Sequence, residues 1–435
     1  MLDKRDWTTL RRVTWWLDQF KSCFGHSAQR ASLRDYVHGL LSDSPRKSMQ
    51  AMLARVSEPR SYQAFQHFIT HAPWDAAAVW RQLWAVLPER RGVLLLDDTA
   101  FLKQGVHSVG VTRQYASARH QVTNCQVAVT AALWTGVRAW FVGAELYLPT
   151  AWLTAERRAA ARIPSGVRFQ EKWRLALRLV QRVRAAGFQL EAVVADAGYG
   201  NVVALRTALD RLGLPFVMGI RSDTAVFASI PTVRPHSPQG RRQARGPGVI
   251  DLPTVSVKAL AARLPAKAWR TISWRNGPQR PWRAQFAAVR VCPAASWRGP
   301  RQVPVYWLLC ERGSAPGSPT RFYLSSLPED CSRRRLVRLA HQRWAIEQQY
   351  SDLKTELGVD HFEGRTYPGW HHHVVLSAVT HAFLQHERVR RRATTLTFPQ
   401  IRAIVQEVFV GLLCISRPRY LAWLNAGQRH LQLRI

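Results

Sequence analysis

The stretch Val93-Leu94-Leu95-Leu96-Asp97-Asp98-Thr99 decides the fold, because four aliphatic residues lead directly into two carboxylates. A short apolar run of this kind is typical of a buried strand. Residues 190–195 form a second such run, which ends at Asp196 in the same way. Further strands are predicted over 125–134, 138–148 and 214–220, and helices over 167–186 and 201–212. Strands followed by helix–strand–helix–strand predict a mixed α/β domain.

The charge of the chain narrows its possible functions. Its 435 residues include 62 Lys plus Arg against 28 Asp plus Glu, a net charge of +34. Such a field attracts nucleic acid or an anionic membrane surface, and it argues against a free small-molecule enzyme or a secreted module. No apolar run of about 18 residues and no secretory leader are visible, so no membrane association is expected. We therefore expect a cytoplasmic nucleic-acid protein.

Two absent patterns refine that expectation. The six cysteines are scattered singly, without a CxxC pair or zinc spacing, and are expected to be reduced and mostly buried. The chain also lacks the G-x-x-x-x-G-K-[ST] phosphate loop, so no use of ATP is expected.

Changes in composition divide the chain into five parts. Residues 1–90 are predicted to be a helical DNA-binding domain, because arginines alternate there with helically spaced apolar residues. The α/β core is expected in two pieces, 91–220 and 329–370, and the second contains a long helix predicted over 333–357. Between them, 221–328 is predicted to be a β-rich insertion with a basic loop at 234–245. Residues 371–435 are expected to form a C-terminal helical region, with helices over 373–388 and 399–414.

Three acidic residues stand out in a chain with so few acids: Asp97, Asp196 and Glu347. Carboxylates at strand ends face the crevice where ligands bind in α/β folds. Three of them can hold two Mg²⁺ ions for phosphodiester chemistry, and Mg²⁺ prefers such hard oxygen ligands. A single Asp after a strand is more often a turn or a cap, but together these acids favour a nuclease site. Asp98 is the alternative to Asp97 as the first metal ligand. Only one of the two can face the site, because neighbouring residues of a strand point to opposite faces.

Cations accompany the third acid. Arg343 lies four residues before Glu347 and Lys354 seven after it, which places all three on one face of a helix. Glu347 would then bind metal while Arg343 and Lys354 take DNA phosphates. Arg390 and Arg391, in the basic run 388–392, are also candidates for phosphate binding, although such a run is often a solvated face.

Histidines and tryptophans receive ordinary interpretations. His371-His372-His373 is expected to be a solvated or DNA-facing helix start rather than a metal site, because no other ligand types lie at suitable spacing. Most tryptophans of the insertion are expected in the core, although an aromatic face could also stack on an unpaired base at a DNA end. These are Trp269, Trp274, Trp282, Trp297 and Trp307.

Three motifs carry a family resemblance. The spacing Arg343-x3-Glu347-x6-Lys354 resembles the third-carboxylate signature of bacterial DDE transposases of the cut-and-paste kind, which has a Tyr where this chain has Ala340. Residues 96–99 with Lys103 resemble the first catalytic segment, Asp-x-Thr, and residues 195–200 resemble the second. Over most of its length, including 46–49 and 67–70, the chain resembles the insertion-sequence transposase family numbered 701.

This resemblance implies a fold and an activity. The fold would be a ribonuclease-H-like catalytic core with a β-rich insertion. The activity would be transposition, in which the enzyme binds terminal inverted repeats and cuts and joins DNA with Mg²⁺, or with Mn²⁺ as a substitute. Asp97, Asp196 and Glu347 would be catalytic metal ligands, and Arg343, Lys354 and Lys103 would hold phosphates. The partners would be repeat and target DNA and a second copy of the chain, in a bacterial cytoplasm at the nucleoid. Two alternatives are a nuclease that cuts without joining and an inactive DNA-binding regulator.

Overall fold

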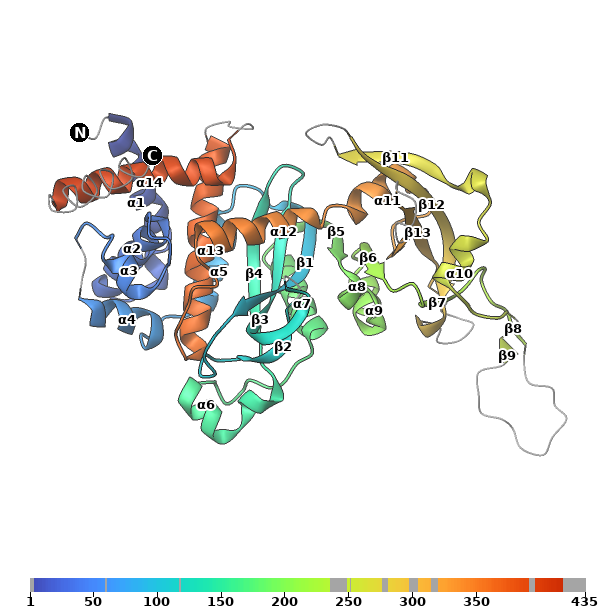
Figure 1. Cartoon of the computed structure of the whole chain (residues 1–435), viewed down its shortest axis with the longest axis horizontal. Helices are drawn as coiled ribbons and strands as arrows, with labels where there is room; N and C mark the ends of the chain where they lie inside the picture. Colours follow the sequence, from blue (N-terminus) through green and yellow to red (C-terminus); the bar gives the residue numbers. More distant parts are fainter. Residues whose placement is uncertain are drawn as a thin grey trace, which may run out of the picture.

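The protein has the mixed α/β architecture that the sequence predicts, with a large sheet beside a group of helices (Figure 1). The computed structural model describes residues 4–58, 61–116, 119–234, 249–250, 252–275, 281–296, 304–313, 320–390 and 396–417. Within these residues one sheet has 12 strands, in the order β10-β7-β12-β13-β14-β6-β5-β1-β3-β2, with β11 paired to β12 and β4 paired to β3.

The strands of the α/β core form one half of this sheet. They are β1 (Arg91–Leu102), β2 (Thr112–Ala116), β3 (Gln121–Trp134), β4 (Ala139–Tyr147), β5 (Gln189–Ala195) and β6 (Phe216–Ile220). β1 pairs antiparallel with β3 and parallel with β5, and β5 pairs parallel with β6. β1 is thus a central strand, with a hairpin meander on one side and helix-connected parallel strands on the other.

The strands of the insertion continue the same sheet, because β14 pairs antiparallel with β6. They are β7 (Ala225–Phe227), β10 (Val255–Ser256), β11 (Arg270–Arg275), β12 (Trp282–Pro293), β13 (Tyr306–Arg312) and β14 (Arg321–Ser325), with the helix α10 (Val257–Ala262). β8 (Val233–Arg234) and β9 (Val249–Ile250) form a separate pair. Apart from residue 234, the predicted basic loop 234–245 lies outside the described residues.

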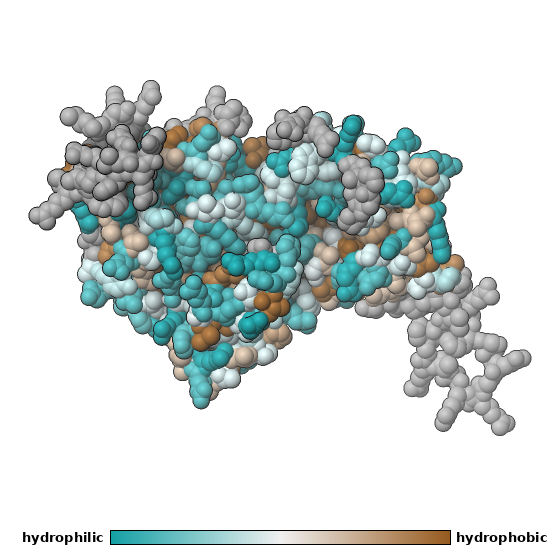
Figure 2. Space-filling model, in the orientation of Figure 1, coloured by the Kyte–Doolittle hydropathy of each residue, from teal (hydrophilic) through white to brown (hydrophobic). Residues whose placement is uncertain are grey.

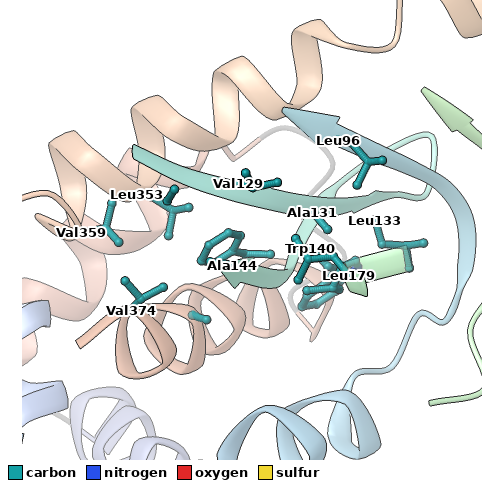
Figure 3. Packing of buried hydrophobic residues seen from close by; sticks show 14 of the residues in the cluster. Leu96, Val129, Ala131, Leu133, Trp140, Ala144, Leu179, Leu353, Val359 and Val374 are labelled. Atoms are coloured by element: carbon teal, nitrogen blue, oxygen red, sulfur yellow. The ribbon is translucent and has the colours of Figure 1, made fainter. Parts of the chain in front are cut away.

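Helices cover both faces of the core strands. On one face, α7 (Lys172–Ala185) inserts Leu179 against Ala131, Leu133 and Trp140 (Figure 3). The other face is covered by α11 (Arg333–Ala340) and α12 (Trp344–Ser351), whose apolar residues form a second cluster with alternate residues of β1 and β5. The short helices α6 (Ala155–Ala161), α8 (Ala197–Gly200) and α9 (Val203–Arg211) lie in the connections of the core. The side chains of residues 93–96 on β1 therefore alternate between two helical layers.

The N-terminal and C-terminal helices form one unit. α1 (Lys4–Asp18), α2 (Ser27–Leu41), α3 (Met49–Leu53), α4 (Tyr62–Thr70) and α5 (Ala76–Val86) accompany α13 (Tyr367–Arg390) and α14 (Phe398–Ser416). The Trp16 indole donates to the Val379 carbonyl at 3.1 Å, which ties α1 to α13. These helices share one hydrophobic cluster with the sheet, so residues 1–90 do not have a core of their own.

The histidine tract lies inside this unit, and the expectation of a solvated helix start is wrong. His372 and His373 are buried on α13. His373 shares a hydrogen bond of 2.7 Å with the Tyr36 hydroxyl, and both ring nitrogens of His372 contact the carbonyls of Ile69 and Trp74. Burial lowers the pKa of both imidazoles, and in the neutral form each ring donates from one nitrogen, so His372 can donate to one of its two carbonyls at a time.

Three smaller expectations can be compared with the structure. Cys125, Cys292 and Cys310 are buried, while the other three cysteines are partly exposed, and all six are unpaired. In the described part of the chain, α14 alone is long and apolar enough to cross a membrane by length and composition. Its residues Ile401 and Val405 are instead buried in the helical unit. The face shown in Figure 2 is mostly hydrophilic, with small scattered apolar areas.

Candidate active site

The candidate site lies where β5 ends and β1 continues. The last parallel pair joins Leu96 to Ala195, so that Asp97 follows it within β1 and Asp196 follows it just after β5. The expectation that β1 ends at Asp97 is wrong, because pairing with β3 extends β1 to Leu102. Asp97 therefore sits within a strand that is still paired with β3 but no longer with β5.

Asp97 is held in a nearly closed environment. Its side chain is 10% exposed, Oδ2 accepts a hydrogen bond of 2.8 Å from Arg343, and Oδ1 accepts one of 2.9 Å from the Asp98 amide. Burial raises the pKa of Asp97 to about 7; Arg343 opposes this rise, and the carboxylates of Asp196 and Asp98 add to it. An acid in such surroundings needs a nearby cation to remain charged.

Asp98 faces the other side of the sheet. Its carboxylate pairs with the ammonium of Lys172 on α7. Asp97, by contrast, faces α12 through Arg343. The two residues therefore point to opposite faces, as the alternation of side chains along a strand requires.

Asp196 caps a helix directly after β5. Its Oδ1 accepts hydrogen bonds from the amides of Gly198 at 2.9 Å and Tyr199 at 3.3 Å, at the start of α8. α8 lies so close to β6 that a Cβ on Gly200 would be 1.9 Å from the Gly219 oxygen. This close contact fixes the segment 196–200, and with it the direction of the Asp196 carboxylate.

Glu347 is joined to Asp97 through a shared cation. Arg343 donates to Asp97 with one terminal nitrogen and to the Glu347 Oε1 with the other, at 2.5 Å. Burial lowers the pKa of Arg343, but the carboxylates of Asp97, Glu347 and Asp196 outweigh burial, and the pKa is raised overall. The structure thus brings Asp97, Asp196 and Glu347 around one guanidinium.

The helix geometry around Glu347 differs from the prediction. The helix expected over 333–357 is broken into α11, α12 and a π-helical turn, Asp352–Glu356, with the break at 341–343. At this break His341 stacks on Trp274, with ring centres 3.9 Å apart. Arg343 is consequently the N-cap residue of α12, and Lys354 lies in the π-helical turn rather than on a common α-helical face.

Side chains of α12 fasten Glu347 over β1. The Tyr350 hydroxyl contacts Thr130 Oγ1 at 2.5 Å, and Thr130 donates to the Asp97 carbonyl at 3.3 Å. Gln349 donates to the Ala139 carbonyl at 2.9 Å. Sequence reasoning missed this chain of contacts, although the spacing of Tyr350, one turn after Glu347, is a signal that could have found it.

The other predicted phosphate-binding residues have internal partners. Lys354 donates to the Ala100 carbonyl at 2.9 Å, and burial lowers its pKa. Lys103 donates to the carbonyls of residues 360 and 362 at 2.8 and 2.7 Å, and burial lowers its pKa to about 8. Arg390 pairs with Glu387 at 3.3 Å, while Arg391 lies outside the described residues. Of the predicted cations, Arg343 is the one placed among the three acids.

The donor set suits a hard divalent cation. Carboxylate oxygens are the ligands that Mg²⁺ and Mn²⁺ take, and Asp97 is buried next to a second carboxylate. In the ranges that the structure describes, no three His, Cys, Asp or Glu side chains are arranged to hold one metal ion. The Arg343 guanidinium instead supplies the positive charge between Asp97 and Glu347. The carboxylate oxygens therefore match a divalent cation in donor type, while the Arg343 guanidinium bridges Asp97 and Glu347 in this structure.

Comparisons with known proteins show which family the chain resembles. Residues 19–281 match the family described as DDE superfamily endonuclease. A probable transposase for insertion sequence element IS701 from Microchaete diplosiphon is 28% identical over 224 residues, which are 49% of this chain and 55% of that relative. The chain thus spans about half the length of that relative. A piggyBac transposase, solved in a synaptic complex with hairpin DNA, superposes with a TM-score of 0.45 at 10% identity, over 95% of this chain and 79% of that one.

Proposed function

Because this chain belongs to the DDE superfamily endonucleases, we propose that it is a DNA transposase. It binds the terminal inverted repeats of its element, cleaves the DNA ends and joins them to target DNA. The observation that carries the proposal is the position of Asp97 on β1 next to Asp196, which directly follows the paired strand β5, with Glu347 joined to Asp97 through Arg343. The core strands and their helices are proposed to be ribonuclease-H-like.

The acids and the arginine have separate roles in this proposal. Asp97, Asp196 and Glu347 would hold Mg²⁺ or Mn²⁺, which supplies positive charge for phosphodiester cleavage and joining. Arg343 is 34% exposed, so its guanidinium can turn from the carboxylates to a DNA phosphate. Tyr350 and Thr130 keep Glu347 in register with Asp97.

The net charge and the similarity to known enzymes support DNA as the partner. A net charge of +34 favours binding to the phosphate backbone. The matched family consists of endonucleases and the relative from Microchaete diplosiphon is a probable transposase, and both kinds of enzyme act on nucleic acid. We further propose that the protein acts as a homodimer on DNA, without ATP, at the bacterial nucleoid.

The burial of Asp97 favours an enzyme over an inactive regulator. A protein that only binds DNA gains nothing from burying a carboxylate, because the cost of burial raises the pKa of Asp97 to about 7. A nuclease that cuts without joining would use the same groups, so the reaction products must separate it from a transposase.

The substitution Asp196→Asn tests the proposal. Asn keeps the shape and can still cap α8, but it removes the charge that a metal ion needs. We expect Mg²⁺-dependent cleavage and joining of a duplex carrying an element end to be lost, while binding to that duplex survives. Asp223→Asn, at an exposed pair with Arg221, is the matched control and should retain activity. An Asp196→Asn variant with full activity would refute the assignment, and cut but unjoined wild-type products would identify a nuclease.

A further inference from the structure

A second cationic site lies beside the start of α12. A cavity of about 680 Å³ opens between the first residues of β1, the turn after β3, the strand β11 and the helix α11. Its lining includes Arg91, Arg275, Arg335 and Arg338, and Glu191 is the only acid among the lining residues. We call this cavity the arginine pocket.

The fold turns two of these arginines outward. The apolar residues Leu336, Val337 and Leu339 of α11 are buried, so Arg335 and Arg338, three residues apart, share the exposed face of this helix. Among the residues that the structure describes, neither side chain has a hydrogen-bond or ion-pair partner. Both guanidinium groups are therefore available to a ligand.

The other two arginines have partners that fix their positions. Arg91 pairs with Glu191 at 3.0 Å on the rim. Arg275 lies flat over the ring of Trp344, 3.7 Å from its centre. The pocket thus combines two held cations with two free ones.

The aromatic walls of the pocket already have ring or guanidinium partners. Trp274 is stacked on His341, and one face of Trp344 is covered by Arg275. Trp134 meets Trp344 edge to face, with ring centres 5.3 Å apart. Since these rings are already engaged, the ligand is selected by charge, and a guanidinium fork matches the oxygens of a phosphate.

The pocket adjoins the candidate active site. Trp344 lines it and directly follows Arg343, and Glu347 lies one helical turn further along α12, about 5 Å of rise. We propose that the arginine pocket binds backbone phosphates of the DNA strand next to the phosphate that is cut. This inference rests on the proposed function, since it assigns part of the same DNA substrate to the pocket.

The double substitution Arg335→Gln/Arg338→Gln tests the inference. The probe is a labelled duplex carrying an element end, taken from the DNA that flanks the gene, and binding is measured by anisotropy from low to high salt. Each lost phosphate contact should reduce the slope of log affinity against log salt by about 0.9, so we expect a reduction of about 2. Cleavage at physiological salt should fall at least tenfold and recover at low salt. Arg211→Gln/Arg263→Gln, two exposed arginines on other elements, is the matched control.

The outcomes separate the pocket from the proposed function. An unchanged melting temperature with a reduced slope supports the pocket, because exposed arginines without partners contribute little to folding. An unchanged slope and unchanged cleavage in the double variant would overturn the pocket even if the wild type cuts. A wild type that never cuts, with a slope that still depends on Arg335 and Arg338, would overturn the transposase and retain the pocket as a DNA site.

Discussion

The neutral substitution Asp97→Asn should make the protein more stable at pH 8 while it abolishes activity. Asp97 is buried and its pKa is raised from 3.8 to about 7, mainly by burial. The folded protein therefore holds this proton more tightly than the unfolded chain does. Wild-type stability must then fall as the pH rises from about 4 to about 7, whereas the asparagine side chain of the variant does not titrate.

The size of the effect follows from the two pKa values. A difference of about 3 pH units corresponds to about 4 kcal/mol at about 1.4 kcal/mol each. The side chain is only 10% exposed, so solvent screening reduces this figure little. The opposing contribution of Arg343 is already contained in the pKa of about 7. The stability of the variant relative to wild type should thus grow by up to about 4 kcal/mol between pH 4 and pH 8.

Urea unfolding at pH 4, 6 and 8, without divalent cations, measures this gap. Asp98→Asn is the matched control, because it removes the neighbouring carboxylate, which pairs with Lys172 on the other face. That pair is partly exposed, so the control should lose up to about 1 kcal/mol at pH 8 rather than gain stability. If the difference in unfolding free energy between Asp97→Asn and wild type does not change with pH, the pKa of Asp97 is not raised by burial.

Two further substitutions test how the site is built. Gly200→Ala should destabilise the fold by about 3 kcal/mol, because its Cβ would meet the Gly219 oxygen at 1.9 Å. Thermal melting measures this loss, and a variant as stable as wild type would contradict the close contact of α8 with β6. Lys103→Met should lower stability by roughly 1–3 kcal/mol, because it leaves two carbonyl groups without their donor, while the salt slope of DNA binding stays unchanged. A slope reduced by about 1 would instead return Lys103 to the phosphate-binding role predicted from the sequence.

The sequence predicted the elements of the core because their periodicities are local. The apolar run 93–96 and the run 190–195 both lie in strands, and the strands expected over 125–134 and 138–148 are β3 and β4. The full length of β1 could not be predicted, because Asp97 and Asp98 have low strand propensity and only pairing with β3 keeps them extended. The continuous sheet was equally hidden, since it depends on the long-range pairing of β14 with β6.

The roles of the three candidate acids stay a prediction, and the structure shows which of them share a cation. Arg343, which the sequence had placed beside Glu347, pairs with both Glu347 and Asp97. The single helix over 333–357 was wrong, because its helical pattern cannot show that His341 stacks on a tryptophan from β11. The partners of Lys103 and Lys354 are backbone carbonyls, which leave no signal in a sequence pattern.

The role of residues 1–90 in recognising inverted repeats remains a prediction, and the structure changes how it must be tested. Deleting them would expose α13, because Trp16 and Tyr36 bind its residues Val379 and His373 and the helices share one hydrophobic cluster. Loss of repeat recognition after deletion would then report unfolding as readily as lost contacts. Substitution of exposed arginines, such as Arg11 on α1 and Arg30 on α2, leaves this core intact. Reduced discrimination between repeat and random DNA in such variants would support recognition by these helices, and unchanged discrimination would assign it elsewhere.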